Sequence, residues 1–392
     1  MDYSNIINNS RVVNVRKVPI TNNFGRYWNS IRYIVPAVTD LKARVGKFNT
    51  PWNTSLDPLF AMPELKVIPD KLSDLMDQRA IEINQIAKRE NKVIYIMWSG
   101  GIDSTSVLVA FLKNLPAQDL ANIVIVMSID SVLENPRFYE TYIQNKFKCI
   151  SYLEYSINAS TLDNCIMLNG DPADALFGPS IFMFKHLVST GEYLKPFKSN
   201  MKLITESIER QGEAMIKKFN VPGFSTWYYF KIAKNIESLP SIGIESVSDW
   251  WWWHYMNFKW EFSIWRAILR RKNREHENVP LSKEQIESFV KNTFFNTNKF
   301  QQWSYSNLRT HIINNDPATH KWEIKQYIYN FDHDSAYQTQ KVKITSVPIY
   351  DHNLYFEVRK PFLLGGDCVG YHDNEHPELV NLCRQKLEEF RG

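Results

Sequence analysis

The chain has 392 residues, and its 46 lysines and arginines exceed its 42 aspartates and glutamates by only 4. With 44% hydrophobic residues it can bury a substantial core, so global disorder is excluded. The near balance of charge gives no argument for nucleic acid or an anionic membrane as a partner. An aromatic content of 14% predicts large buried surfaces, a partner interface such as that of a homo-oligomer, or both.

The sequence also indicates a compartment. Its N-terminus has no apolar core of signal-peptide length, and no window approaches about 18 uninterrupted apolar residues. The four cysteines are widely spaced and form no CxxC pair, which argues against a zinc module or a disulfide framework. We therefore predict a soluble cytoplasmic protein without membrane spans.

In chain order, residues 1–69 predict an irregular or partly β N-terminal extension. Apolar residues at helical spacing then predict an amphipathic helix over 71–90. Buried-strand patterns and helical patterns alternate after it: strand 93–97, helix 105–115, strand 123–127, helix 136–147, strand 149–155 and strand 165–168. This alternation predicts an α/β fold with a parallel sheet over 70–185.

The remainder, 186–392, predicts a mainly helical C-terminal lobe that carries most of the tryptophans. Turn-rich stretches near 190–200 and 219–225 are candidate boundaries, and 377–390 is a predicted terminal helix. The predicted division is thus an extension (1–69), an α/β domain (70–185) and a helical lobe (186–392).

The string Ser99-Gly100-Gly101-Ile102-Asp103-Ser104 lies between a predicted strand and a predicted helix. Adjacent glycines allow a tight turn and a close backbone approach to a ligand, and a helix N-terminus attracts anions. The serines add hydroxyl donors, and Asp103 adds an oxygen ligand for magnesium. The string therefore predicts a pyrophosphate site with its metal, against the alternative of an ordinary Gly-Gly turn. The Walker-type GxxxxGK[ST] pattern is absent.

A second acidic string, Gly170-Asp171-Pro172-Ala173-Asp174, follows the predicted strand at 165–168. Open parallel sheets bind ligands at the carboxyl ends of their strands. Asp171 and Asp174 can therefore face one magnesium–phosphate centre together with Asp103. The alternative is a turn before a solvated helix start, where aspartate is common.

The first string resembles the PP-loop of the N-type ATP pyrophosphatases, which cleave ATP between the α and β phosphates. The second, extended to 178 as GDPADALFG, resembles the GDGADELFGG motif of the asparagine synthetase synthase domain. The resemblance covers about 90–345 and is tight at these two loops. It implies a PP-loop α/β fold and an ATP- and Mg²⁺-dependent ligase. Such an enzyme adenylates a small-molecule carboxylate, releases pyrophosphate and transfers the acyl group to ammonia or another amine.

The resemblance also implies roles for individual residues. The nucleotide-binding positions are Ser99, Gly100, Gly101, Asp103 and Ser104. Asp103 and Asp174 match the magnesium-binding acids, and Asp171 matches the acid that holds the attacking amine and helps to remove its proton. Residues 336–341 resemble the family's RQK segment, whose lysine stabilises developing charge. Lys341 is therefore the catalytic candidate, with Lys343 as the fallback and a solvated lysine as the alternative.

The sequence departs from the family at several positions. Glutamine-dependent members begin with a catalytic cysteine, whereas position 2 is Asp2 and the first cysteine is Cys149. We therefore expect free ammonia, a separate glutaminase or a different amine as the nitrogen source. Ala175 replaces an acid, and Pro172 replaces a glycine. Residues 293–297 correspond only loosely to the segment that shapes the acceptor pocket, which leaves the carboxylate substrate open.

Two other functions remain open. A nucleotide- or tRNA-modifying PP-loop ATP pyrophosphatase would need an acceptor surface, for which the basic run at 270–274 and the four tryptophans at 250–253 are the only hints. Four consecutive residues go all the way round a helix, so the tryptophans predict a core or an interface in preference to base stacking. The only residue that favours a non-catalytic nucleotide-binding protein is Ala175, where the family has an acid.

The C-terminal segment contains Cys368, His372 and His376. These residues predict a polar turn in preference to a metal cluster.

Overall fold

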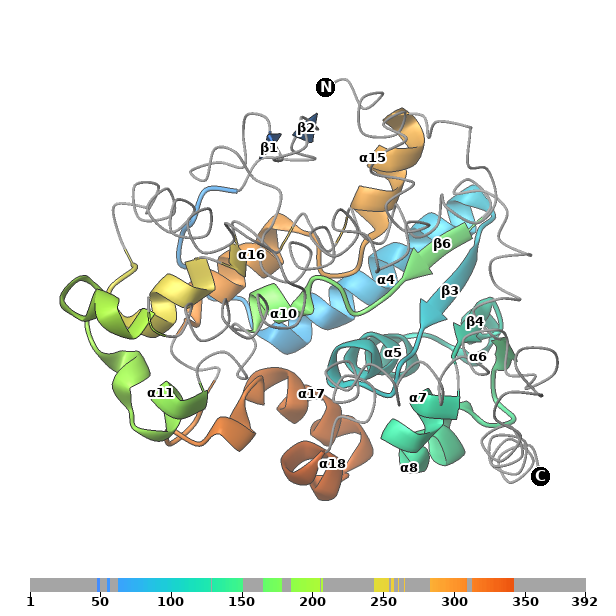
Figure 1. Cartoon of the computed structure of the whole chain (residues 1–392). Helices are drawn as coiled ribbons and strands as arrows, with labels where there is room; N and C mark the ends of the chain where they lie inside the picture. The colour runs from blue at the N-terminus through green and yellow to red at the C-terminus, as the bar shows by residue number, and fades with distance from the viewer. Residues whose placement is uncertain are drawn as a thin grey trace, which may run out of the picture. The chain divides into compact units, whose positions relative to one another are not determined.

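The computed structural model in Figure 1 describes only part of the chain. The described residues are 48–49, 55–56, 63–127, 129–150, 165–177, 185–204, 206, 243–253, 255–256, 260, 264, 283–308 and 312–341. Several sequence predictions lie outside them: the segments at 219–225, 270–274 and 377–390, the residues Lys343, Cys368, His372 and His376, and most of the extension 1–69.

Two compact units divide the chain. The sheet unit comprises the described residues of Lys71–Gly170, Asn292–Phe294 and Ile324–Gly392. The tryptophan unit comprises those of Met1–Asp70, Asp171–Lys291 and Phe295–Glu323. Each unit combines segments from across the chain, and the predicted linear division at 70 and 186 stays a prediction.

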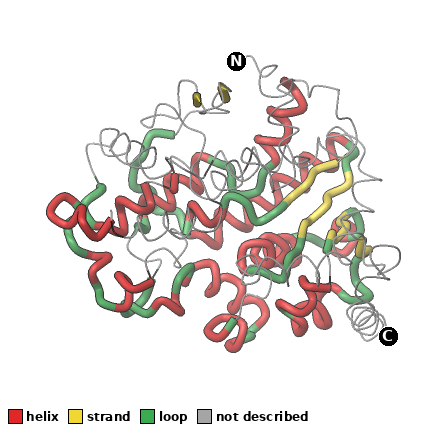
Figure 2. Tube along the Cα trace, in the orientation of Figure 1, coloured by secondary structure: helices red, strands yellow, loops and turns green. Residues whose placement is uncertain are grey.

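The sheet unit is built on a four-stranded sheet in the order β5-β4-β3-β6, with every pair parallel. Its strands are β3 (Val93–Met97), β4 (Ile123–Val126), β5 (Lys148–Ile150) and β6 (Cys165–Leu168), drawn in yellow in Figure 2. All four residues of β4 are buried, as expected of a parallel strand that is covered on both faces. The predicted α/β fold with a parallel sheet is confirmed.

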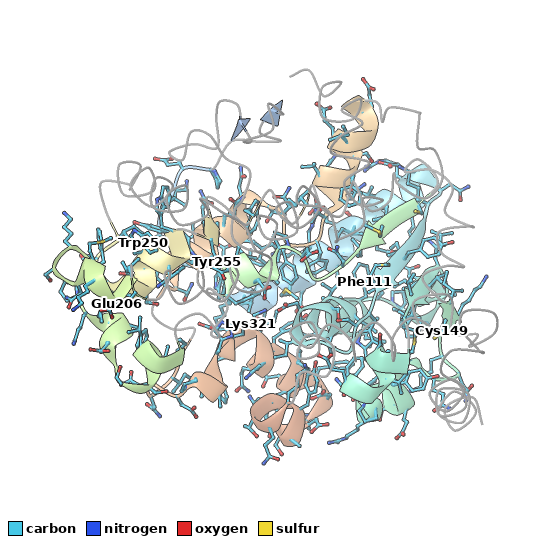
Figure 3. All side chains as sticks on the ribbon, in the orientation of Figure 1. Phe111, Cys149, Glu206, Trp250, Tyr255 and Lys321 are labelled. Carbon is cyan, nitrogen blue, oxygen red and sulfur yellow. The ribbon has the colours of Figure 1, made fainter. Side chains whose placement is uncertain are left out.

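Two long helices pack against each other and against β3 in this unit, α4 (Leu72–Glu90) and α5 (Ile102–Asn114). The predicted helix at 71–90 is confirmed as α4, and its apolar stripe is buried. Phe111 of α5, labelled in Figure 3, is fully buried and lies 6.2 Å from the ring of Phe294. Arg79 of α4 donates to the carbonyls of Thr293 and Phe294, so this distant segment is fixed in the core of the sheet unit.

The segment after β4 differs from its prediction. The expected helix at 136–147 is replaced by two short pieces, α8 (Pro136–Phe138) and the π-helix η1 (Tyr139–Ile143), and a further short helix, α7 (Ile129–Glu134), precedes them. Asn135 caps α8 by accepting from the amide of Phe138. Because proline has no amide hydrogen and is favoured in a first helical turn, the Asn-Pro pair ends α7 and starts a new helix. This break places Glu134 at the end of α7.

Shorter elements complete the sheet unit. The four-residue helix α6 (Ala117–Leu120) leads into β4. Helices α17 (Trp322–Asp332) and α18 (Ser335–Gln340) come from much later in the sequence. Tyr327 of α17 donates to Asp77 of α4 over 2.6 Å, and Asp334 caps α18 by accepting from the amide of Tyr337. These contacts fix the late helices within the unit.

In the tryptophan unit the four consecutive tryptophans are core residues. Each of Trp250, Trp251, Trp252 and Trp253 is no more than 1% exposed. The indole N–H of Trp252 donates to the hydroxyl of Ser304, which in turn donates to the carbonyl of Leu176. The prediction that this run is buried is confirmed, so its rings are not a surface for base stacking.

The remaining elements of the tryptophan unit are short. They are β1 (Phe48–Asn49), β2 (Ser55–Leu56), α10 (Ala173–Leu176), α11 (Lys185–Ser189), η3 (Glu192–Leu194), η4 (Lys198–Asn200), α15 (Lys283–Asn292), α16 (Asn298–Ser306) and η5 (Pro317–Thr319). Strands β1 and β2 pair antiparallel. No helix formed by the described residues has both the length and the apolar character needed to cross a bilayer.

Candidate functional site

The string at 99–104, here called the glycine loop, connects the carboxyl end of β3 to the N-terminus of α5. Gly100 has φ +71°, a left-handed conformation that glycine adopts without strain. Gly101 is the N-cap of α5, and having no side chain it cannot accept from the amides of the first turn. Those amides have no carbonyl partner within the helix, so they are suited to an anion. Helix α5 begins three residues before the predicted start at 105.

Gly100 also allows helix α7 to pack closely against the glycine loop. A Cβ at this position would lie 2.3 Å from the carbonyl oxygen of Ser131 and 2.9 Å from Cβ of Glu134. Both neighbours belong to α7, the helix that follows β4. The first glycine of the loop is therefore required by the packing of α7 as well as by its own backbone conformation.

The two serines of the glycine loop bind each other. Their hydroxyl oxygens are 3.0 Å apart, and the hydroxyl of Ser104 also accepts from the amide of Ser99 and donates to the carbonyl of Gly101. Ser104 is buried, whereas Ser99 is exposed. The hydroxyl of Ser104 thus holds the loop in shape, and Ser99 is the serine that solvent reaches.

Asp103 lies in the first turn of α5 and is partly exposed. The turn after β6 packs directly against its backbone, because a Cβ on Gly170 would lie 2.7 Å from Cβ of Asp103 and 3.0 Å from the amide nitrogen of Ser104. Strands β3 and β6 are neighbours, with Ile96 opposite Leu168. Strands β3 and β6 therefore end at the same edge of the sheet, as expected, and the turn after β6 lies against the glycine loop as far as Gly170.

This close packing predicts the effect of a methyl group at Gly170. Gly170→Ala should shift the first turn of α5 and lower stability by about 1–3 kcal/mol. Thermal unfolding would measure this loss. In Gly101→Ala, the matched control, the new methyl meets only side-chain oxygens at 3.0 and 3.4 Å, so its stability loss should be smaller. Equal losses in the two variants would contradict the packing explanation.

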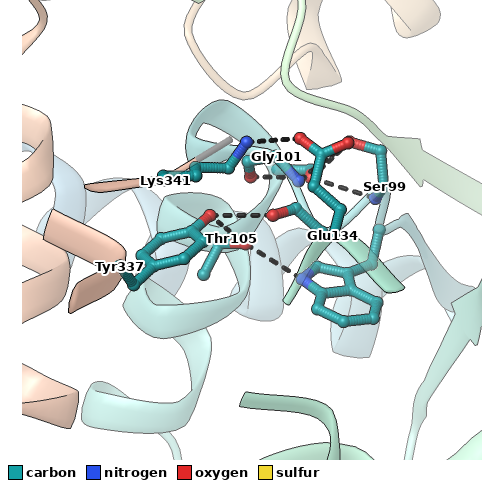
Figure 4. A network of polar contacts seen from close by, with 9 residues as sticks. Ser99, Gly101, Thr105, Glu134, Tyr337 and Lys341 are labelled. Carbon is teal, nitrogen blue, oxygen red and sulfur yellow. Dashed lines mark hydrogen bonds and ion pairs between the residues drawn. The ribbon is translucent and has the colours of Figure 1, made fainter. Parts of the chain in front are cut away.

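Lys341, the predicted catalytic lysine, is almost fully buried and directly follows α18. Its ammonium group forms an ion pair with the carboxylate of Glu134, whose side chain is fully buried (Figure 4). The Tyr337 hydroxyl donates to the carbonyl of Gly100 over 2.8 Å and lies 3.2 Å from the Thr105 hydroxyl. Lys341 is therefore not a solvated lysine but part of a buried polar network at the glycine loop.

The Tyr337 hydroxyl acts as a donor in this network. Burial raises the pKa of Tyr337 well above its usual range, and the nearby carboxylates of Glu134 and Asp103 raise it further. The indole N–H of Trp98 donates to the Thr105 hydroxyl over 3.1 Å and extends the network beneath the loop. A phenol that stays protonated at neutral pH keeps α18 bonded to Gly100.

Asp171 and Asp174 belong to the tryptophan unit, whereas Asp103 and Lys341 belong to the sheet unit. Asp174 lies in the first turn of α10, and its carboxylate, which is 42% exposed, pairs with the ammonium of Lys321 over 2.5 Å. Lys321, labelled in Figure 3, is buried and has φ +63°. Asp171 is partly exposed and directly follows Gly170 in the chain.

The donor chemistry at the predicted metal-binding positions suits magnesium. No group of three or more His, Cys, Asp or Glu side chains forms a metal site within the part of the chain that is described. Magnesium does not require such a group, because it keeps several waters and uses one or two carboxylates together with substrate phosphates. Asp103 and Asp174 each offer carboxylate oxygens of this kind. The carboxylate of Asp174 also forms an ion pair with the ammonium of Lys321.

Sequence reasoning missed three of these residues. They are Glu134, Tyr337 and Lys321, and each is bonded to a residue more than 140 positions away in the chain. Glu134 pairs with Lys341 across 207 positions, Tyr337 with Gly100 across 237, and Lys321 with Asp174 across 147. Tyr337 lies inside the string at 336–341, in which the resemblance gives a role only to the lysine. For Glu134 the sequence holds no local signal other than the Asn-Pro break that follows it.

No protein-family model, curated protein sequence or solved structure matches the chain.

Proposed function

We propose that the protein is an ATP-dependent carbon–nitrogen ligase that activates a carboxylate with ATP and transfers the acyl group to ammonia or another amine. The observation that carries the proposal is the glycine loop at the carboxyl edge of a parallel sheet, with the buried Lys341–Glu134 pair beside it. An uncapped helix N-terminus and a lysine are groups that bind and stabilise polyphosphate.

In the first half-reaction, a carboxylate oxygen attacks the α-phosphorus of ATP, and the bond between the α-phosphorus and the bridging oxygen breaks. Pyrophosphate leaves with the bonding electrons. The amides at the start of α5 would bind phosphate oxygens, and Lys341 would stabilise the charge that develops on the leaving group. Magnesium, for which Asp103 offers a carboxylate oxygen beside the glycine loop, would neutralise part of the polyphosphate charge. The carboxylate becomes reactive because AMP is a good leaving group.

In the second half-reaction, the amine nitrogen attacks the activated carbonyl carbon, AMP leaves and the nitrogen loses one proton. We assign the proton transfer to Asp171, because it follows Gly170 at the carboxyl end of β6 and is partly exposed. The amine is ammonia from solution or from a separate glutaminase, or a different amine.

The test is ATP consumption with a panel of amino acids and other small carboxylic acids plus ammonium. Pyrophosphate and AMP are measured against phosphate and ADP. Release of pyrophosphate and AMP that depends on one acid would support the ligase and name its substrate. Magnesium-dependent ATP binding without turnover of any small acid would instead favour a macromolecular acceptor, such as tRNA.

The role of Asp171 predicts a selective loss in Asp171→Asn. Amide formation should fall by about 10²–10⁴-fold, because an amide side chain cannot accept the proton of the amine, whereas pyrophosphate release should fall much less. Both products can be measured in one reaction, with Asp171→Glu as the variant that keeps a carboxylate. Equal losses of pyrophosphate and amide in Asp171→Asn would refute the proton-transfer role.

A further inference from the structure

The ion pair of Lys341 and Glu134 cannot be separated without a large energetic cost. The Glu134 side chain is fully buried, and that of Lys341 is only 6% exposed. An ionised carboxylate that loses its partner in such surroundings is left neither solvated nor paired, which is strongly unfavourable. Glu134 therefore determines where the ammonium group of Lys341 lies.

The same carboxylate borders the glycine loop. Oε1 of Glu134, the oxygen that pairs with Lys341, lies 3.4 Å from the position that a Cβ of Gly101 would occupy. Cβ of Glu134 lies 2.9 Å from the corresponding position of Gly100. Figure 4 shows the carboxylate of Glu134 facing the ammonium of Lys341 beside Gly101. A nucleotide phosphate bound at the first turn of α5 would thus meet a lysine whose charge is already balanced.

The backbone next to Lys341 is fixed at the same loop. Tyr337, four residues earlier, donates to the carbonyl of Gly100, and the ammonium of Lys341 lies 5.8 Å from the centroid of its ring. The helix that carries Tyr337 is capped by Asp334, whose carboxylate is also 3.4 Å from the guanidinium of Arg137. Lys341 is therefore positioned at its base by Tyr337 and at its tip by Glu134.

We propose that Glu134 is a positioning residue for the first half-reaction, an inference that rests on the proposed function. It holds the Lys341 ammonium at the glycine loop and balances its charge throughout the reaction. Because the pair is neutral as a whole, it adds little to the binding of ATP in the ground state. As negative charge grows on the leaving oxygen, an N–H group of the held ammonium can donate a hydrogen bond to that oxygen. This directional, short-range interaction strengthens as the bond breaks and lowers the barrier selectively.

This role predicts opposite effects on binding and on turnover. In Glu134→Gln, a negative charge beside the phosphates is removed, so the affinity for the magnesium complex of α,β-methylene-ATP should stay equal or rise. Pyrophosphate release should nevertheless fall by about 10²-fold, because the ammonium is no longer held in place. In Lys341→Gln, the unbalanced carboxylate should weaken binding of the same analogue by about tenfold.

The double variant Glu134→Gln/Lys341→Gln distinguishes this role from a general structural one. Its affinity for the analogue should return to within about threefold of the wild-type value, while its turnover stays as low as in Lys341→Gln. Glu90→Gln is the matched control, because it removes a surface carboxylate that pairs with Lys92 over 3.0 Å. Both its affinity and its turnover should equal those of the wild type.

A second measurement needs no nucleotide. The rate at which acetic anhydride modifies Lys341, measured by mass spectrometry relative to the exposed Lys198, should be low in the wild type. It should rise at least several-fold in Glu134→Gln. If that variant does not fold, Glu134→Asp keeps the charge, and it should show wild-type affinity with reduced turnover.

The outcomes separate the two proposals. A wild-type protein that does not bind magnesium–nucleotide would overturn the proposed function, whereas the labelling experiment would still report on the ion pair. A wild-type protein that releases pyrophosphate, together with an equally active Glu134→Gln variant, would overturn the positioning role alone. Parallel losses of affinity and turnover in Glu134→Gln would also overturn it.

Discussion

Gly100→Ala is expected to destabilise the sheet unit more than any other single methyl addition at the glycine loop. Alanine at φ +71° is strained, and its Cβ would overlap the carbonyl oxygen of Ser131 at 2.3 Å. The two effects together should lower stability by about 3 kcal/mol or more, since left-handed backbone costs about 1–2 kcal/mol and overpacking about 1–3 kcal/mol. Thermal unfolding followed by circular dichroism measures the loss.

The chain supplies a matched control for this prediction. Gly191 has φ +73°, nearly the same as Gly100, but a Cβ there would meet only the side-chain nitrogen of Asn315 at 3.5 Å. Gly191→Ala should therefore show only the backbone cost of about 1–2 kcal/mol. If the two variants unfold at the same temperature, the contact between α7 and the glycine loop does not have the importance assigned to it. Nucleotide binding should be lost in Gly100→Ala alone.

Asp103→Asn should strongly reduce magnesium-dependent ATP turnover and leave the fold intact. The amide is close in shape to the carboxylate, and the side chain is partly exposed, so there is no cavity and no steric clash. The neutral oxygen is a weaker magnesium ligand, and we expect a loss of about 10²–10³-fold in pyrophosphate release. Removal of a charge from the first turn of α5 should cost only about 0.3–1 kcal/mol of stability.

Asp74→Asn serves as the control for Asp103→Asn, because Asp74 is an exposed aspartate in the first turn of α4. It tests the loss of a helix-terminal charge away from the glycine loop. Turnover measured over a range of magnesium concentrations should be unchanged in Asp74→Asn and lower by about 10²–10³-fold in Asp103→Asn. Full activity in Asp103→Asn would rule out the assignment of the loop as a PP-loop.

The sequence predicts best what depends on neighbours in the chain. Strands β3 and β6 begin and end at the predicted residues, because each is a short apolar run that follows a polar residue and leads into a glycine-containing turn, at Gly100 after β3 and at Gly170 after β6. Helix α4 follows from its apolar periodicity. The start of α5 was predicted three residues too late, because the first turn, Ile-Asp-Ser, reads as loop until Gly101 is known to be the N-cap.

The parts of the site that come from distant segments could not be predicted in the same way. The string at 336–341 suggested Lys341 as a catalytic group, but its partner Glu134 lies 207 positions away. The hydroxyl of Ser104, a predicted ligand contact, is bonded within the loop to the amide of Ser99 and the carbonyl of Gly101, and no local pattern indicates these bonds. Such pairings depend on tertiary packing, for which local sequence patterns carry no information.

The interleaved course of the chain has a consequence for how the sheet unit can fold. Its core includes Arg79 bonded to Phe294 across 215 positions and Tyr337 bonded to Gly100 across 237 positions. Contacts of such high sequence separation form late, because the entropy of closing a long loop must be overcome first. A nascent chain that ends soon after β6 contains every strand of the sheet but lacks the residues that fix the glycine loop. The sheet edge that carries the glycine loop is therefore completed only after Tyr337 and Lys341 have been synthesised.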